Sequence, residues 1–492
     1  MKTKKNLTSY YTILFFILAI GIIIGVLFVQ PQVGVADQGD FNRIMSISGL
    51  SLLDSDANNP NFIRFMKYIV TDYQITSINN LTSTILGSSL GYLIILINNI
   101  CKSFGQTIFK TQYLAIIYSI IYILSFSIIL KSLNIKNRMK FIILEISILF
   151  FFFDGNYLIW FNSLYGEPMM FTTLVLFIAS VLNYIHYKYI LKKNEKIFSK
   201  IFFILFSAFL FLGSKLQVLT SLPIIILFII KILFDNRHSL NKINLSILCI
   251  VFCFVIAYPV GISRNSDDLN VDTQYNSVFY GILKDSKTPE QDLIDLGLNP
   301  NMAVDAGKNA YLDDDKYVKY SPKSELTAKE FYHNINNLKL AKFYLFHPQR
   351  LLNGMNYTAS KAFSTSTMLG KYYRNYSEEP VTDFNRFTLW STFRQNVLPH
   401  ELYFIVSVYL LLAIYSLYKY IKNKSNLEIK AKLLLLWTIM LIGAIQFPMP
   451  FVGNGEADTA KQLFLFNFIF DGLLLSVFSY IIFKIIDLFK IE

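Results

Sequence analysis

The stretch YTILFFILAIGIIIGVLFVQ, residues 11–30, decides the fold class, because no charged side chain interrupts it. A transmembrane helix needs about 20 predominantly apolar residues to cross the hydrocarbon core of a bilayer. The run is longer than the roughly 7–15 apolar residues of a secretory signal peptide, although GVA at 34–36 resembles a cleavage site. The sequence therefore predicts a membrane-spanning anchor here.

Composition extends this prediction to the rest of the chain. Of its 492 residues, 54% are hydrophobic and only 16% are charged. This balance excludes a soluble enzyme, a disordered chain and a disulfide-stapled secreted domain. We expect an all-α multi-pass membrane protein with about ten transmembrane helices. Nine further apolar runs could span a bilayer, at about 113–130, 141–158, 169–187, 201–213, 217–233, 243–261, 401–418, 433–447 and 463–486.

The basic residues predict the orientation of the spans. The net charge is +12, and the lysines and arginines gather in loops between alternate spans, at 131–140, 188–200, 231–242 and 419–432. Cytoplasmic loops carry an excess of Lys and Arg, so we expect these loops and both ends of the chain to be cytoplasmic. The positive charge is then a topology signal, and nucleic-acid binding loses its support.

One apolar stretch needs a different interpretation. Counting ILGSSLGYLIILINNIC at 85–101 as a span would move every later loop to the other side of the membrane and break the charge pattern. We therefore expect it to form a helix that lies in the membrane interface.

Three regions follow from this topology. Residues 1–261 form an N-terminal transmembrane module with a first extracytoplasmic loop at 31–112, and 401–492 form the C-terminal transmembrane helices. The polar region 262–400 is long enough for a small, α-rich extracytoplasmic domain. Within it, 326–353 has the pattern of one helix, with Thr327 and Glu330 as a capping box.

Candidate functional residues stand where spans meet the extracytoplasmic surface, because ionisable groups at such depths are costly and usually functional. The segment ADQGDFNRIM, 36–45, holds Asp37, Asp40 and Arg43 directly after the first span. Arg43 lies three residues beyond Asp40 and so on the same helical face. An acidic, solvated helix start is the ordinary alternative for either aspartate.

The turn DGNYLIWFNSLYGEPMM, 154–170, is the second group. Glu167 stands before Pro168, which can begin the next helix in its first turn. The neighbouring aromatic residues suit either a funnel for sugar stacking or an ordinary aromatic belt; they are Tyr157, Trp160, Phe161 and Tyr165, of which Tyr165 is a candidate substrate contact.

Two further turns complete the set. In GSKLQ, 213–217, Lys215 is the one charge, and with Gln217 beside it the ammonium could hold a phosphate at the membrane surface. The loop GNGEADTAKQ, 453–462, brings Glu456, Asp458 and Lys461 to the last span, and Glu456 and Asp458 are candidate substrate contacts. In the large extracytoplasmic domain, His347, Arg350 and Tyr357 are candidate acceptor contacts, with a purely structural helix and loop as the alternative.

These residue types suit group transfer from a lipid. No nucleotide sugar is supplied outside the cytoplasm, so an enzyme acting there draws its activated group from a carrier such as polyprenyl phosphate. Transfer needs a carboxylate to accept the proton of the acceptor hydroxyl, and cations to stabilise the departing phosphate. Asp40 fits the first role, and Lys215 with Arg43 fits the second.

The chain resembles the GT-C glycosyltransferases, which use polyprenyl-linked sugar donors. The resemblance rests on DQGDFNRIM after the first span, YGEPMM in the next outside turn and a large outside loop late in the chain. Three segments are similar to the WsfD-like glycan biosynthesis hexose transferases of Gram-positive bacteria: YNSVFYGIL at 275–283, DLIDLGLNP at 292–300 and GEADTAKQLFLFN at 455–467.

The resemblance implies an enzyme of the bacterial cell membrane with an extracytoplasmic active site. It would transfer a hexose, with inversion, from a polyprenyl phosphate to a cell-envelope glycan or glycoprotein. The family base falls on Asp40, with Asp37 as the open alternative, its second acidic residue on Glu167 and its lipid-phosphate cation on Lys215. Some members need a divalent cation, Mg²⁺ or Mn²⁺, and the sequence leaves that requirement open.

Two other functions compete with this one. A ligase or polymerase that consumes polyprenyl-pyrophosphate-linked glycans would need more than one basic residue on the outside turns. The outside loops offer Arg264, Arg350 and Arg374 besides Lys215, so this alternative stays open. A lipid-linked glycan flippase or another transporter would place charges at mid-membrane depth in repeated halves. Asp471 is one central candidate for such a charge, and the sequence has no visible internal repeat.

Overall fold

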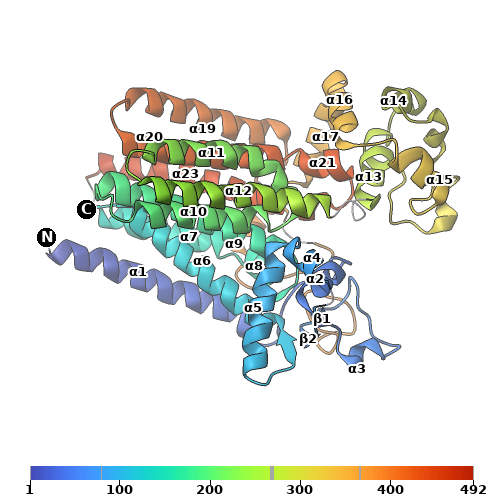
Figure 1. The fold of residues 1–492 in the computed structure, drawn as a ribbon, viewed down its shortest axis with the longest axis horizontal. Coiled ribbons are helices and arrows are strands. Elements are labelled where there is room, and N and C mark those ends of the chain that lie inside the picture. Colours follow the sequence, from blue (N-terminus) through green and yellow to red (C-terminus); the bar gives the residue numbers. More distant parts are fainter. Residues whose placement is uncertain (1, 79, 266–270, 365–366, 491–492) are drawn as a thin grey trace.

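The structure is a computed structural model that describes residues 2–78, 80–265, 271–364 and 367–490. It is mostly helical, with 69% of residues in helices. Figure 1 shows a bundle of long helices with two smaller assemblies at one of its ends. These assemblies come from segments 29–110 and 265–401, and the end of the bundle that carries them is called the domain end below.

Within the described residues, eight helical stretches are long and apolar enough to cross a membrane. They confirm eight of the ten predicted spans as long apolar helices: Tyr10–Phe28 (α1, Lys2–Ile23, with η1, Ile24–Phe28), α6 (Thr111–Leu133), Glu167–Ile190 (α9, Glu167–Ile185, with η3, His186–Ile190), Leu216–Asn236 (η4, Leu216–Ser221, with α11, Leu222–Asn236), α12 (Lys242–Arg264), α19 (Leu402–Lys422), Leu427–Asn454 (α20, Leu427–Gln446, with α21, Met449–Asn454) and α23 (Phe464–Leu488).

The other two predicted spans are helical but irregular. The run 141–158 forms α7 (Arg138–Phe152), which is followed after a 53° bend by α8 (Gly155–Leu158) and η2 (Ile159–Asn162). The run 201–213 lies in α10 (Ile197–Leu212), which has 16 residues and is shorter than the eight long helical stretches. The bend after α7 turns the chain back toward the bundle and delivers it to the start of α9.

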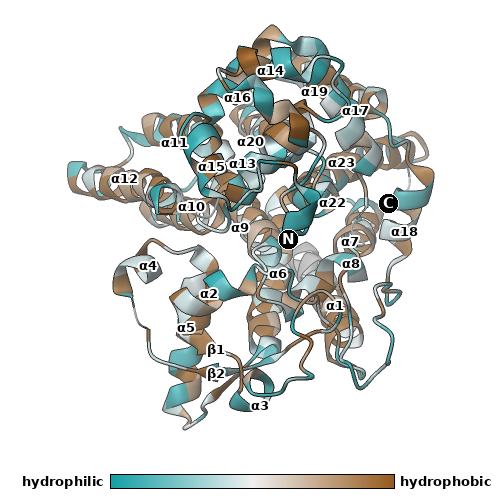
Figure 2. Cartoon of the chain, turned by 90° about the vertical axis from the view of Figure 1, so that its right-hand side faces the viewer, coloured by the Kyte–Doolittle hydropathy of each residue, from teal (hydrophilic) through white to brown (hydrophobic). Residues whose placement is uncertain are grey.

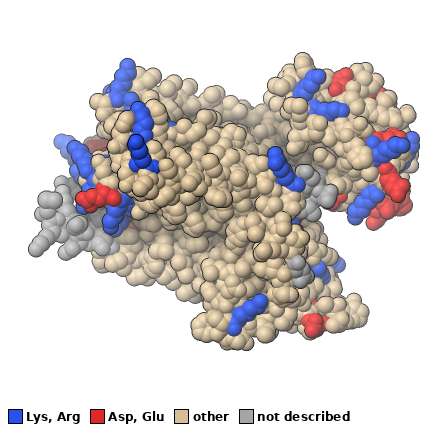
Figure 3. Space-filling model, viewed as in Figure 1, with Lys and Arg blue, Asp and Glu red and all other residues tan. Residues whose placement is uncertain are grey.

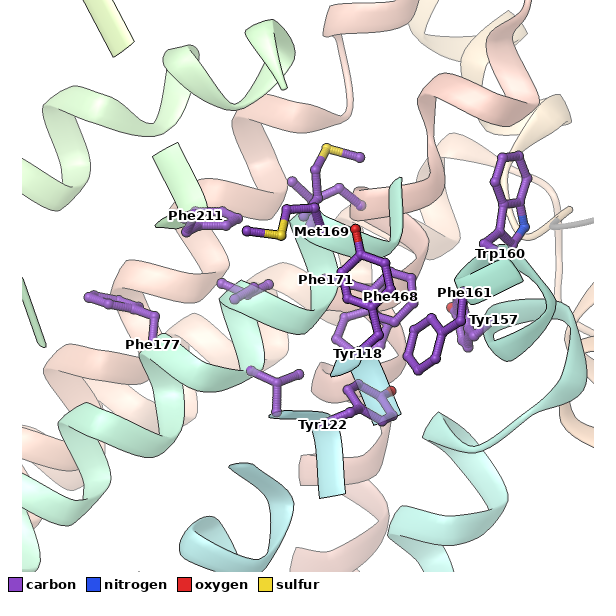
Figure 4. Close-up of a cluster of buried hydrophobic side chains, with 14 of the residues drawn as sticks. Tyr118, Tyr122, Tyr157, Trp160, Phe161, Met169, Phe171, Phe177, Phe211 and Phe468 are labelled. Carbon is purple, nitrogen blue, oxygen red and sulfur yellow. The ribbon is translucent and has the colours of Figure 1, made fainter. Parts of the chain in front are cut away.

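Helix α9 is the centre of the bundle. It packs against α6, α10, α20 and α23. Of the most apolar 18 consecutive residues in Glu167–Ile190, 89% are buried within the protein. Figure 4 shows the aromatic cluster that surrounds its first turns, in which Phe171 stacks between Phe161 at 5.6 Å and Phe468 at 5.1 Å. Such ring pairs contribute about 0.5–1.5 kcal/mol each beyond their buried area, so the start of α9 is held rigidly.

The predicted aromatic funnel is wrong, and so is its alternative, an aromatic belt. Tyr157, Trp160, Phe161 and Tyr165 are all buried, and each ring contacts other buried aromatic rings. The pattern was misleading because α8 and η2 fold inward after the bend and turn their rings toward α6, α9 and α23.

The predicted basic loops all lie at one end of the bundle, called the basic end below. The start of α1 and the end of α23 lie there, and successive long helices alternate in direction, so the loops after α6, η3, α11 and α19 return to the same end (Figure 1). In Figure 3, the charged side chains of the face in view gather toward the two ends of the bundle, and the middle is nearly free of charge. This distribution matches a membrane-embedded middle.

Segment 29–110 contains a small sheet that the all-α prediction did not include. Strands β1 (Leu50–Ser51), β2 (Asp72–Ile75) and β3 (Ile108–Lys110) pair in the order β1-β2-β3, antiparallel throughout. Tyr73 pairs with Phe109, and the alternating burial of β2 puts Tyr73 and Ile75 in the core. Strands of two to four residues give too short an alternation to be predicted from sequence.

The apolar stretch at 85–101 forms α5 (Ser89–Ser103), a separate helix of 15 residues. In Figure 1 it runs steeply across the direction of the long helices. This placement fits the predicted interfacial helix, whose depth in a bilayer stays a prediction.

Segment 265–401 holds helices in its described residues, apart from the irregular stretch 367–388, in which Tyr372 forms an isolated bridge with Val33. It contains α13 (Val271–Ser277), α14 (Pro289–Asp295), α15 (Glu325–Thr327), α16 (Asn337–Phe346), α17 (Pro348–Lys361) and α18 (Leu389–Val397), with short η turns between them. The prediction of one helix over 326–353 is wrong, because Asn336 caps a new helix and Pro348 begins another. Ser324, not Thr327, caps α15.

A fully buried ion pair joins segment 265–401 to the bundle. Arg394 in α18 donates to Asp471 Oδ2 in α23 at 2.5 Å, and both side chains are completely buried. Tyr157 donates to the same oxygen at 2.6 Å, and Asp154 accepts the Ser391 backbone N–H at 3.0 Å. The central charge of Asp471 is thus balanced by Arg394.

Candidate functional site

The turn between Asp37 and Asp40 begins the site. Asp37 Oδ1 accepts the backbone N–H groups of Gly39 at 2.7 Å and Phe41 at 3.2 Å. Gly39 has φ +117°, a conformation that glycine adopts without the steric cost of a side chain. Burial raises the pKa of Asp37, although those two N–H groups and Arg64 oppose the change. At 2% exposure Asp37 shapes the turn, and the turn presents Asp40 at the start of α2 (Phe41–Ser48).

Asp40 is partly exposed and strongly paired. Its Oδ2 accepts a hydrogen bond from Lys461 Nζ at 2.7 Å. Burial alone would raise the pKa of Asp40, but the charges of Lys461, Lys215 and Arg43 outweigh it and lower the pKa to about 2. Asp40 is therefore a carboxylate at any physiological pH.

Lys461, in α22 (Thr459–Gln462), connects the first and last parts of the chain. Only 8% of its side chain is exposed, and Nζ also donates to Gln38 Oε1 at 2.9 Å. Gln38 Nε2 in turn donates to Asp458 Oδ2 at 2.7 Å. Burial would lower the pKa of Lys461, but the Asp40, Glu167 and Asp458 carboxylates raise it above its ordinary value.

Sequence reasoning placed Lys461 in a candidate loop but gave it no role in the site, and it did not select Gln38. One signal for Lys461 was present, because it is the one Lys or Arg between Lys432 and Lys484 and it stands where the last span begins. Gln38 gave no such signal, since its role depends on a contact 423 positions away.

Glu167 and Lys215 form the second ion pair of the site. Glu167 lies in the first turn of α9, and Pro168 begins that helix as predicted. The glutamate is 0% exposed, and its Oε1 accepts from Lys215 Nζ at 2.6 Å. Among the described residues, Oε2 of Glu167 has no hydrogen-bond partner. A buried carboxylate oxygen without a partner is costly, so this atom is suited to receive a ligand's hydroxyl.

The four predicted catalytic and phosphate-binding residues line one cavity of about 650 Å³. Asp40 and Arg43 come from the start of α2, Glu167 from the start of α9, and Lys215 from the turn before η4. The rest of the wall includes the apolar side chains Ile44, Ile47, Leu86, Leu164, Leu216 and Ile262. Its volume lies in the range of small-molecule sites, and its lining suits a ligand with a charged group and an apolar part. It is called the first cavity below.

A second cavity of about 280 Å³ lies on the other side of the Gln38–Lys461 contact. Gln38, Asp458 and Lys461 form its polar wall, and Tyr357 and Met368 are among its other lining residues. Lys461 lines the second cavity, and its Nζ binds Asp40, which lines the first cavity. The Asp40–Lys461 ion pair therefore lies between the two cavities. Figure 2 views the domain end, where α22, which carries Lys461, lies between segment 29–110 and segment 265–401.

A family model, the YfdI N-terminal transmembrane domain, matches residues 1–491. The chain belongs to the YfdI N-terminal transmembrane domain family. Comparisons with curated proteins and with solved structures find no match. Membership in the YfdI family agrees with the helical, multi-pass architecture described above, and the activity has to be argued from the site.

Tyr165 and Gln217 line neither of the two cavities of this YfdI family member. The structure therefore does not place them as the predicted substrate contacts. Tyr165 is buried; its hydroxyl donates to Ala36 O and accepts from Gln38 N, both at 2.8 Å, and Lys461 Nζ lies 4.8 Å from its ring centre. Gln217 Nε2 donates to Gln462 O at 2.8 Å. Both residues fix the chain around Lys461.

Three other predicted contacts serve the fold of segment 265–401. His347 lies 3.2 Å from Asp295, and Arg350 donates to Asp292 Oδ2 and Ser286 Oγ at 2.7 Å, so both join α17 to the region around α14. Glu456 pairs with Lys284. None of these side chains lines the two cavities. Asp458, in contrast, lines the second cavity as a substrate contact would.

The donor set does not fit a resident divalent cation. Within the described residues, no group of three or more His, Cys, Asp or Glu side chains gathers as metal ligands would. Asp40 and Glu167 each bind a lysine instead. Two ammonium groups thus supply positive charge beside the carboxylates of this YfdI family member, and no step below depends on a metal.

Proposed function

We propose that the protein is a glycosyltransferase that uses a polyprenyl-phosphate hexose on the extracytoplasmic side of a bacterial cell membrane. The observation that carries the proposal is the first cavity, which joins an apolar wall to Asp40, Arg43, Glu167 and Lys215. A polyprenyl-phosphate sugar has groups that match this lining: an apolar chain for the apolar wall, one phosphate for the two cations and a polar sugar for the carboxylates. The earlier resemblance to the GT-C transferases supports the same conclusion.

The donor phosphate would bind between Lys215 and Arg43. Both side chains line the first cavity, and both lie close enough to Asp40 to lower its pKa. Charge-assisted hydrogen bonds of this kind are roughly twice as strong as neutral ones. Two cations suit a single phosphate, which favours a phosphate-linked donor over a pyrophosphate-linked one.

The chemical step would be one inverting displacement. Asp40 accepts the proton of the acceptor hydroxyl, whose oxygen forms a bond to the anomeric carbon of the sugar. The bond from that carbon to the phosphate oxygen breaks, and polyprenyl phosphate leaves with the electron pair, stabilised by Lys215 and Arg43. The acceptor would approach through the second cavity, with Asp458 as a polar contact, and Glu167 Oε2 would accept a substrate hydroxyl.

Donor binding would also strengthen the base. A carboxylate with a pKa of about 2 is a weak base, because Lys461, Lys215 and Arg43 stabilise its charge. A phosphate between Lys215 and Arg43 adds negative charge beside Asp40 and so raises the pKa of that carboxyl. Asp40 therefore becomes a better proton acceptor once the donor is in place, which links the two binding events.

The test is direct. The purified protein is incubated with a panel of polyprenyl-phosphate hexoses and an extract of envelope glycans, and the release of free polyprenyl phosphate is measured. We expect release with at least one donor and incorporation of that hexose into glycan. If no donor is consumed while the protein remains folded, the proposal is rejected.

Changing Lys215→Ala is expected to weaken use of the donor about 10–100-fold in kcat/KM, because a hydrogen bond to a charged group contributes about 1.5–3 kcal/mol. The variant also leaves Glu167 buried without its cation. Lys215→Ala is therefore made alone and with Glu167→Gln, which removes the unpaired charge. Lys102→Ala, an exposed lysine outside the cavity, is the control. Unchanged donor use in both Lys215 variants would exclude a phosphate-binding role.

The proposed topology places the domain end outside the cell. In a background without Cys101, Cys249 and Cys253, Asp315→Cys at the domain end is expected to react with an impermeant maleimide added to intact cells. Asp315 is well exposed, so its substitution leaves the core unchanged. Lys193→Cys in the loop between η3 and α10 is the matched control and should react only after lysis. The reverse labelling pattern would place the site in the cytoplasm.

A further inference from the structure

A third cavity, of about 310 Å³, lies away from the two cavities of the site. It is bordered by the chain after α3 (Asp54–Ala57), by the residues that lead into β2 and by residues 373–375. We propose that this cavity binds the distal sugars of an extended acceptor glycan. The inference rests on the proposed function, and it specifies the substrate class as an oligosaccharide or polysaccharide chain rather than a single sugar or a lipid headgroup.

The lining of the third cavity has the chemistry that recognises sugars. Two carboxylates, Asp56 and Asp72, lie close enough that Asp72 contributes to the raised pKa of Asp56, after burial. Asn59, Asn61 and Asn375 add exposed amides. Carboxylates accept and amides both donate and accept, so together they match the hydroxyl groups of a glycan. Phe62, Tyr68 and Tyr373 supply aromatic surface for the apolar faces of sugar rings.

The third cavity is lined by residues that closely follow those of the second along the chain. The same two stretches of chain border both: Met66 and Thr367–Leu369 line the second cavity, whereas Tyr68–Asp72 and Tyr373–Asn375 line the third. These stretches are hydrogen-bonded to each other between the cavities, through Gly370 N to Met66 O at 2.8 Å and Ile69 N to Tyr372 O at 3.2 Å. An extended chain rises roughly 3.3 Å per residue, so neighbouring positions along it are within reach of one oligosaccharide.

Several contacts hold the third cavity open as a defined shape. Arg374 Nη1 donates to Asn61 O at 2.8 Å, which ties the two walls together. The Tyr68 hydroxyl donates to Glu378 O, and the Thr71 and Tyr373 hydroxyls bind each other. The side chains of Asp56 and Asn375, in contrast, make no hydrogen bond within the part of the chain that the structure describes, so both are available to a ligand.

The proposal is tested by binding without any donor. The probe is a size-fractionated oligosaccharide ladder, from disaccharide upward, prepared by partial acid hydrolysis of envelope polysaccharide from the producing cells. Calorimetric titration of the full-length protein in detergent gives the affinity for each length. We expect affinity to rise in a step once a chain is long enough to reach from the second cavity into the third.

The decisive variants are Asp56→Ala and Asn375→Ala, with Asp54→Ala as the matched control. Asp54 lies in the same short helix, is exposed and does not line the cavity. Each decisive variant should bind long chains about tenfold more weakly, as the loss of a good hydrogen bond predicts, and short chains as the wild type does. Affinity that does not depend on length, or variants equal to the wild type on long chains, would overturn the proposal.

The outcome separates this inference from the proposed function. If disaccharides accept sugar from a polyprenyl phosphate but length has no effect on affinity, the third cavity alone is rejected. If no member of the ladder is glycosylated with any donor in the panel, the proposed function fails, whatever the binding results show.

Discussion

Asp40→Asn is expected to lower the rate of hexose transfer about 10²–10⁴-fold, the usual contribution of a positioned general base. Asparagine keeps the shape of the side chain and an oxygen that can accept from Lys461, but it cannot take a proton from the acceptor. Lys461 also retains the nearby charges of Glu167 and Asp458. The thermal midpoint should therefore stay close to that of the wild type. Release of polyprenyl phosphate and thermal unfolding are measured on the same preparation.

Asp37→Asn is the matched control for this prediction. It stands in the same turn, and its Oδ1, which accepts from Gly39 and Phe41, is retained in asparagine. Asp37 is 2% exposed and does not line the first cavity, so we expect a much smaller loss of activity. Retained transfer in Asp40→Asn together with inactivity in Asp37→Asn would move the base to Asp37.

Arg394→Met is expected to produce the largest loss of stability in the described part of the chain. Arg394 and Asp471 are both fully buried, so removing the guanidinium leaves a carboxylate in the core with only the Tyr157 hydroxyl on Oδ2. Breaking a buried pair in this way costs about 3–5 kcal/mol. The measurement is the apparent midpoint of thermal unfolding in detergent, together with the yield of folded protein.

The double variant Arg394→Met with Asp471→Leu separates pairing from simple loss of packing. Replacement of both charges by apolar groups is expected to recover most of the lost stability, because no unpaired charge remains. Lys432→Met, which removes half of the exposed Glu428–Lys432 pair, is the control and should change stability by about 0.5 kcal/mol or less. Equal effects of Arg394→Met and Lys432→Met would show that the buried pair does not hold segment 265–401 to the bundle.

Much of the membrane architecture could be predicted from sequence. Apolar runs such as 11–30 and 463–486 became long helices, because a bilayer requires about 20 apolar residues and few other structures use them. The structure of the chain before α6 was harder to predict from sequence. Strand β2 has four residues, and its partners lie at Leu50–Ser51 and Ile108–Lys110, so no local pattern could specify the sheet. The helix predicted over 326–353 ends where Asn336 and Pro348 start new ones.

Some residues of the candidate site could also be predicted from sequence, and others could not. Asp40, Glu167 and Lys215 were predictable as neighbours, because each stands at the same end of its span and charged residues are rare at such positions. Their roles in catalysis stay predictions. Tyr165, His347 and Arg350 were chosen by residue type, yet their side chains are committed to structural contacts. Which polar side chains face a cavity depends on packing between distant segments, and one sequence does not contain that information.

The contact between Asp40 and Lys461 has a consequence for biosynthesis. The two residues are 421 positions apart, one just after the first long helix and the other just before the last. A nascent chain that a ribosome has translated only as far as α20 holds Asp40 without this partner. Since domains form in the order of synthesis, the first cavity reaches its final electrostatic state only when translation is nearly finished.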